Sequence, residues 1–128
     1  MRVLLTGASG FLGRAIARRL KDAGHAVTAL VRHADADLDA LDIEQQAGDI
    51  VSLDTLASAT VGCDAVVHCA AHTTPFGRID DYYDANVRGT DNVLAAAEIV
   101  GVRKVVFTSC AGVVIDHADL NGVNETQR

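Results

Sequence analysis

Aromatic side chains and proline are scarce in this sequence, and basic residues are outnumbered. Aromatics make up 4% of the 128 residues, tryptophan is absent, and Pro75 is the single proline. Lysine and arginine total 11 against 17 acidic residues, and a net charge of −6 argues against nonspecific nucleic-acid or anionic-lipid partners. No apolar run reaches the ~18 residues of a membrane span, so no membrane partner is expected. The three cysteines lack metal-like spacing, which predicts no metal site and a reduced, cytoplasmic protein.

The sequence is rich in small and branched apolar residues, with 49% of positions hydrophobic. Short apolar runs alternate with helical stretches, a pattern typical of βαβ units and of a buried parallel sheet. The predicted strands are Arg2–Thr6, Ala26–Val31, Gln46–Ile50, Ala65–Cys69 and Lys104–Thr108. The predicted helices are Phe11–Ala23, Leu53–Thr60 and Ile79–Val100, with a short helix inside the loop 33–42. The core-facing stripe expected on the long helix is Ile79, Tyr83, Val87, Thr90, Leu94 and Ala97.

A glycine-rich loop, Gly7-Ala8-Ser9-Gly10-Phe11-Leu12-Gly13, joins the first strand to the first helix. Gly7 allows the tight turn, Gly10 lets backbone amides approach a pyrophosphate, and Gly13 allows close packing of helix on sheet. The amides of the first helical turn, around Phe11 and Leu12, then face the anion. We therefore expect a dinucleotide on this loop, with Ser9 in the cradle. A phosphate loop of the kinase type is excluded, because no Gly-Lys-Ser/Thr follows.

The spacing Gly-x-x-Gly-x-x-Gly and four later blocks resemble the extended branch of the short-chain dehydrogenase/reductase superfamily, which comprises epimerases, dehydratases and dihydroflavonol-reductase-like enzymes. The later blocks are Gly48-Asp49-Ile50, His68-Cys69-Ala70-Ala71, the helical segment 82–90 and the segment 105–111. The resemblance covers essentially the whole chain. It implies an α/β, Rossmann-type doubly wound parallel sheet of about five strands in the order 3-2-1-4-5, with helices on both faces.

The residues expected to bind the cofactor follow the strand ends. Arg32 stands where an acidic residue would bind the ribose of NAD, so its guanidinium is expected to pair with the 2′-phosphate of NADP. NADP is therefore the predicted cofactor and NAD the alternative; a solvated surface arginine is the competing interpretation. The resemblance implies that Asp49 contacts the adenine amino group and that Ile50 lines the ring. Ala70 and Ala71 are small enough for the cofactor to approach their backbone.

The residues expected to support catalysis are fewer. Asn86 is expected on the inward side of the long helix, where the resemblance implies that it helps to order the active site; an amide that bonds a neighbouring loop is the alternative. The family uses a Ser or Thr after the fifth strand, and that position falls at Cys110, with Ser109 and the cofactor-side Thr108 before it. A thiol is a weak donor, so Ser109 is the substitute candidate.

The Tyr-x-x-x-Lys pair of the family is absent, because the only lysines are Lys21 and Lys104 and both tyrosines lie on the long helix. We expect residues 1–128 to be a single NAD(P)-binding domain and the N-terminal fragment of a longer enzyme, since residues 121–126 resemble the link before the catalytic helix. The complete enzyme would act on a small carbonyl or nucleotide-sugar substrate. The competing hypothesis is a noncatalytic NADP-binding redox sensor or interaction protein. The exposed edge of the fifth strand favours self-association into a homo-oligomer.

Overall fold

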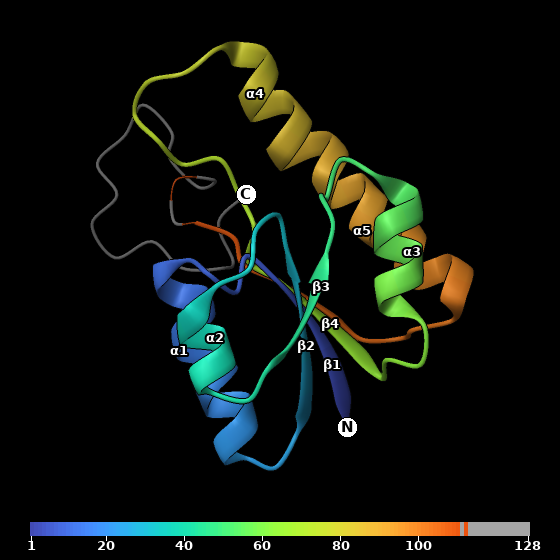
Figure 1. The fold of residues 1–128 in the computed structure, drawn as a ribbon. Helices are drawn as coiled ribbons and strands as arrows, with labels where there is room; N and C mark the ends of the chain where they lie inside the picture. Colours follow the sequence, from blue (N-terminus) through green and yellow to red (C-terminus); the bar gives the residue numbers. More distant parts are fainter. Residues whose placement is uncertain (111, 113–128) are drawn as a thin grey trace, which may run out of the picture.

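The computed structural model describes residues 1–110 and 112, and these form a parallel sheet with helices on both faces (Figure 1). The five strands run in the order β3-β2-β1-β4-β5, which confirms the predicted topology. The strands are β1 (Arg2–Thr6), β2 (Ala26–Val31), β3 (Glu44–Ala47), β4 (Ala65–His68) and β5 (Val105–Phe107). β1 lies at the centre, between β2 and β4, and every neighbouring pair is parallel.

Helices cover the two faces of the sheet separately. They are α1 (Phe11–Asp22), α2 (Ala36–Ala40), α3 (Leu53–Thr60), α4 (Ile79–Tyr83) and α5 (Gly89–Val100). On one face, residues of α1 and α2 pack with alternate residues of β1 and β2, centred on Leu5, Ala17 and Leu38. On the other face α3 and α5 pack side by side over Leu4 and Val66 (Figure 1). The sheet is therefore buried on both sides at its centre, as the continuous apolar strands predict.

The third strand begins and ends earlier than predicted. It spans Glu44–Ala47 rather than residues 46–50, and pairs with β2 from Thr28 to Val31. Gly48 still donates its amide to Val31 O at 2.9 Å, but the chain then leaves the sheet into the turn around Asp49. Asp49 and Ile50 accordingly lie beyond the strand end, among the loops that precede α3.

The predicted long helix is interrupted by a π-helical turn, η1 (Asp84–Arg88), between α4 and α5. The buried face of α5 consists of Gly89, Val93, Ala96 and Ala97. The predicted core stripe was wrong for most of its members, because Ile79 is 82% exposed and Leu94 is 50% exposed. A π turn accommodates one more residue per turn than an α-helical turn, so apolar residues before it fall out of phase with the core-facing side after it.

Within the described part of the chain, no helix is both long enough and apolar enough to cross a bilayer.

The corrected face of α5 makes a stability prediction at two adjacent positions. Val93 is 1% exposed and packs in the core, whereas Leu94 is half exposed. Val93→Ala should lower the free energy of unfolding by about 2 kcal/mol, through lost burial and a residual cavity. Leu94→Ala should change it by less than about 0.5 kcal/mol. Urea unfolding of the two variants measures the difference, and a larger loss for Leu94→Ala would mean that the predicted stripe was the true core face.

Candidate functional site

The predicted site residues gather at the carboxyl edge of the sheet. The chain leaves β1 after Thr6, β2 after Val31 and β4 after His68, all at this edge. From β1 the sheet runs to β2 and β3 on one side and to β4 and β5 on the other, so the strand order reverses between β1 and β4. Doubly wound sheets bind their ligands in the crevice outside such a reversal. The loops after β1 and β4 are therefore the walls of the candidate site.

The glycine loop makes two backbone contacts that no side chain would permit. Gly7 has φ +71°, and a Cβ there would lie 2.5 Å from Ala70 N. A Cβ on Gly13 would lie 2.0 Å from Gly7 O, inside the turn itself. Gly10 differs, since its φ is −78° and its nearest neighbour would be Gly7 O at 3.2 Å. Gly7 and Gly13 are therefore required by the fold, while at Gly10 a Cβ would need a shift of only a few tenths of an ångström.

The first turn of α1 carries free amides. Gly10 is the N-cap residue, and no side chain caps the helix. Gly10 N donates to Gly7 O at 3.0 Å and Arg14 N donates to Gly10 O at 2.9 Å, so the turn is closed at its base. Ser9 is exposed and Phe11 is 99% exposed, which leaves this helix end open. An uncapped helix N-terminus with this geometry favours an anion.

The loop after β4 is fixed to β1 and to the π turn. Cys69 N donates to Thr6 O at 3.2 Å, and Ala70 N donates to Thr6 Oγ1 at 3.3 Å. Further along, His72 N donates to Asn86 Oδ1 at 2.7 Å and Asn86 Nδ2 donates to His72 O at 3.1 Å. The Asn86 side chain thus bonds both backbone groups of one loop residue. Asn86 is exposed, so the prediction of an inward position was wrong.

The reason for this correction lies in the helix phase. The buried side of the helix begins at Gly89, where a Cβ would lie 2.6 Å from Ile50 Cδ1. Asn86 precedes that residue inside the π turn and points to the loop instead of the core. The amide contact with a neighbouring loop, left open by the sequence, is the one that the structure contains.

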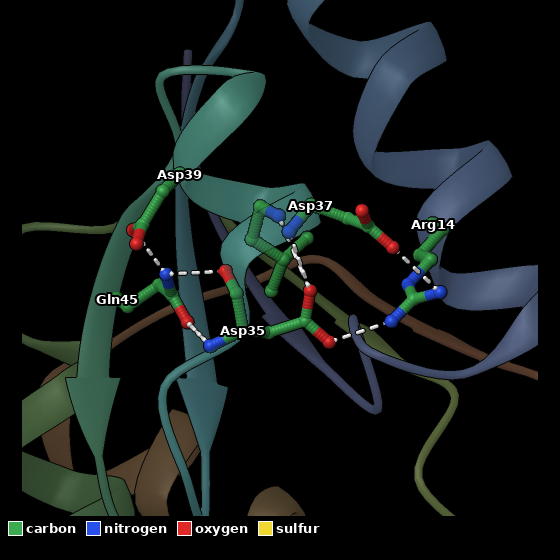
Figure 2. A network of polar contacts seen from close by, with 6 residues as sticks. Arg14, Asp35, Asp37, Asp39 and Gln45 are labelled. Atoms are coloured by element: carbon green, nitrogen blue, oxygen red, sulfur yellow. Dashed lines mark hydrogen bonds and ion pairs between the residues drawn. The ribbon is translucent and has the colours of Figure 1, made fainter.

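A polar network ties α1 to the loop before α2 (Figure 2). Arg14 contacts Asp35 Oδ2 at 2.7 Å and Asp37 Oδ2 at 2.9 Å. Asp35 also caps α2, accepting hydrogen bonds from Asp37 N and Leu38 N. Gln45 on β3 accepts from Asp35 N at 2.8 Å and donates to Asp35 O at 3.0 Å, and its amide also contacts Asp39.

In this network the acidic groups nearest the end of β2, Asp35 and Asp37, are both paired with Arg14. The hydrogen bond from Arg14 holds the pKa of Asp35 below its ordinary value, despite partial burial. The Asp35 side chain is only 12% exposed. Arg32 follows β2 directly, is exposed, and has no ion-pair partner within residues 1–110. No local pattern predicts that Arg14 holds both aspartates, because the pairing depends on how α1 and α2 pack together.

The remaining predicted residues lie around the same edge. Asp49 Oδ1 accepts from Val51 N at 3.1 Å, and Ile50 packs against the α3–α5 core. Thr108 Oγ1 lies 3.2 Å from Cys69 Sγ, which joins the ends of β4 and β5. Ser109 and Cys110 are exposed just beyond. The segment 121–126 falls outside the described residues.

The loop between β4 and α4 forms an open hollow of about 700 Å³. Its lining residues are Pro75, Phe76, Gly77, Ile79 and Tyr82. Tyr82 OH donates to Thr74 O and its ring packs edge-on against His72, with centroids 4.4 Å apart. The sequence pattern placed Ile79 and Tyr82 on the long helix and marked no site at residues 75–77. The signal that was available is the pair of large apolar residues, Phe76 and Ile79, in an otherwise polar stretch.

Within residues 1–110 and 112, no group of three or more metal-ligating side chains comes together.

The chain belongs to the NAD dependent epimerase/dehydratase family, whose pattern it matches over residues 3–127. Among curated proteins it is 39% identical over 122 residues to 2-alkyl-3-oxoalkanoate reductase from Shewanella oneidensis. That match covers 95% of this chain and 32% of the reductase.

Solved structures show the same fold. A short-chain dehydrogenase/reductase superfamily protein from Agrobacterium tumefaciens with bound NAD superposes with a TM-score of 0.78, at 30% identity, over 89% of this chain and 34% of that one. UDP-glucose-4-epimerase from Stenotrophomonas maltophila, with bound NAD and formylated UDP-arabinopyranose, gives a TM-score of 0.84 at 26% identity, over 98% of this chain and 41% of that one. The chain thus spans about a third of the length of the relatives it matches.

The glycine geometry predicts opposite outcomes for two alanine variants. Gly13→Ala should lower the free energy of unfolding by more than about 3 kcal/mol, because the new Cβ overlaps Gly7 backbone at 2.0 Å. Gly10→Ala should leave the fold intact, because its Cβ is only a few tenths of an ångström too close to Gly7 O. Thermal unfolding separates the two. If Gly13→Ala unfolds at the parent temperature, the loop packs less closely on α1 than described.

Proposed function

We propose that this chain binds NADP(H) through the glycine loop and the uncapped first turn of α1. The family is NAD-dependent, and two structural relatives hold NAD. The observation that carries the proposal is the contact of Gly7 with the backbone of Ala70. It closes the loops after β1 and β4 on each other at the strand-order reversal, beside the uncapped amides of the first turn of α1.

Arg32 supports NADP over NAD. A ribose with free hydroxyls is best held by a carboxylate, but Asp35 and Asp37 are both paired with Arg14. The guanidinium of Arg32, exposed directly after β2, offers a planar pair of donors to a 2′-phosphate. When bound, NADPH supplies a hydride, while the chain itself supplies the phosphate cradle, the 2′-phosphate contact and the orientation.

We expect at least about tenfold tighter binding of NADPH than of NADH, the equivalent of one charge-assisted hydrogen bond. Arg32→Ala should abolish this preference with little change in NADH affinity, since NADH lacks the 2′-phosphate. Arg18→Ala, an exposed arginine of α1, is the matched control for loss of one positive charge. Calorimetric titration of each variant with both cofactors measures the ratios. Equal affinities in the parent, or an equal effect of the two substitutions, would refute the assignment of Arg32.

We also propose that these 128 residues bind the cofactor without turnover. Reduction of a carbonyl needs a proton donor beside the oxygen, and the sequence has no Tyr-x-x-x-Lys pair. The exposed thiol of Cys110 is a weak hydrogen-bond donor, and Ser109 is an alcohol without an adjacent base in the described segment. The complete protein would add the proton donor to the cofactor site described here.

For the complete protein we propose a ketone substrate that carries an apolar chain. The hollow beside the π turn is lined mainly by apolar side chains, with Phe76 88% exposed. The reductase that is 39% identical to this chain has a name that denotes a ketone bearing an alkyl group. A nucleotide sugar, as in the epimerase relative, would need more polar partners than the Tyr82 hydroxyl, the one polar side-chain group among the described residues that line this hollow. A noncatalytic NADP-binding sensor remains the competing function, and turnover by the complete protein separates the two.

The chain should be incubated with NADPH and a panel of ketones, aldehydes and nucleotide sugars, and NADPH oxidation followed by its absorbance. We expect no oxidation above background. Cys110→Ala and His72→Ala, assayed in parallel, should be indistinguishable from the parent. Rapid turnover that either substitution abolishes would contradict the proposal and assign the proton donor to that residue.

A further inference from the structure

His68 is a buried histidine that the proposed cofactor site does not use. It ends β4, is 1% exposed, and pairs in register with Thr6 on β1 and with Phe107 on β5. Its Nδ1 lies 2.6 Å from Thr6 Oγ1 and its Nε2 lies 3.1 Å from Thr90 Oγ1. Phe107 stacks on the ring, with centroids 5.6 Å apart. Both ring nitrogens are therefore occupied, which leaves neither free for acid–base chemistry on a substrate.

The neighbours of His68 fix the direction of every hydrogen bond around it. Thr90 Oγ1 donates to Asn86 O at 2.8 Å, so the same oxygen must accept the hydrogen bond from His68 Nε2–H. The imidazole is then the Nε2–H tautomer, and Nδ1 accepts from the hydroxyl of Thr6. Thr6 Oγ1 in turn accepts from Ala70 N at 3.3 Å. One neutral tautomer thus satisfies a chain of bonds from Ala70 to Asn86.

We infer that neutral Nε2–H His68 is a positioning residue, which holds the Ala70 backbone and the Asn86 turn in a fixed relation by this single chain of hydrogen bonds. The inference deepens the proposed cofactor site, since Ala70 is the backbone against which Gly7 packs and Asn86 holds the loop beyond it. His68 acts through these groups and has no contact of its own with the ligand.

Protonation of His68 would interrupt this series of hydrogen bonds at one point, the bond between His68 and Thr6. An imidazolium donates from both nitrogens, so Thr6 Oγ1 would accept hydrogen bonds from His68 Nδ1–H and from Ala70 N–H together. The hydroxyl proton of Thr6, which is fully buried, would lose its acceptor. Among residues 1–110 and 112, the elements packed on the ring are β1, α5 and β5, and they present Thr6, Thr90 and Phe107, none of which is titratable or charged. Burial lowers the pKa of His68, in agreement with a ring that stays neutral.

Two substitutions of His68 test separately the hydrogen bonds on its Nδ1 side and those on its Nε2 side. Asparagine places an amide where Nδ1 lies and can still accept from Thr6, whereas glutamine reaches the position of Nε2 and can still donate to Thr90. His68→Gln should therefore speed amide hydrogen exchange at Ala70 by about tenfold, the loss of about one hydrogen bond, and spare the His72 amide bonded to Asn86. His68→Asn should do the reverse. His25→Gln, at the opposite edge of the sheet, is the matched control and should alter neither amide.

The exchange experiment is done without cofactor, so its outcome does not depend on the proposed function. Long-range proton–nitrogen spectra of the imidazole, recorded on the same sample, should show His68 protonated at Nε2 only. Titration with NADPH then adds the link to the site: His68→Gln should weaken binding several-fold and His68→Asn less. If the parent does not bind NADPH, the cofactor assignment is refuted but the role of His68 is not. A protonated Nδ1, or equal exchange effects of the two substitutions at both amides, would overturn the role of His68.

Acid stability provides a further check with a defined sign. The unfolded chain protonates this histidine below pH about 6.5, while the folded chain does so only at lower pH, so the unfolded state binds more protons in that window. Stability should therefore fall as pH drops below about 6.5. The unfolding constant should rise by up to about tenfold per pH unit more in the parent than in His68→Gln, measured by urea unfolding from pH 5 to 8. Parallel pH dependences would refute a neutral, buried His68.

Discussion

Backbone-to-backbone contact between the first loop and its neighbours is the constraint on which the rest of the site depends. Gly7 turns with positive φ directly against Ala70, and Gly13 brings α1 onto the carbonyl of Gly7. A parallel sheet whose order reverses at β1 leaves a crevice there, but the crevice is shaped only because these atoms can approach so closely. The open helix end, the loop after β4 and the buried His68 all take their positions from this contact.

Polar side chains at both ends of the glycine loop bond it to the neighbouring loops. Thr6, one residue before Gly7, bonds both the Ala70 amide and the ring of His68. On the other side of the loop, Arg14 follows Gly13 and reaches the aspartates that start α2. Each end of the glycine loop is therefore continued by a residue that anchors a different neighbouring loop. These contacts hold the glycine loop at both ends against its neighbouring loops.

The strand positions to within three residues and the glycine loop follow from the sequence, because apolar runs and glycine spacing are local signals. The strand order was implied by the resemblance to the family. The face of the long helix does not, since the π turn at Asp84–Arg88 changes the phase without any unusual residue to mark it. Asn86 was placed inward for the same reason. The Arg14 network and the bonds of His68 join residues far apart in the chain. Arg14 and Asp35 are 21 positions apart, and Thr6 and His68 are 62 positions apart. Periodicity carries no information about such pairs.

The two hydrogen bonds between the Asn86 side-chain amide and the His72 backbone have an evolutionary consequence. It closes residues 73–85 into a loop whose two ends are held together independently of what lies between them. Closure entropy grows only slowly with loop length, so insertions or replacements there would cost little and would not reach the sheet. Sequence changes between residues 73 and 85 can then accumulate while the sheet and the glycine loop keep their geometry.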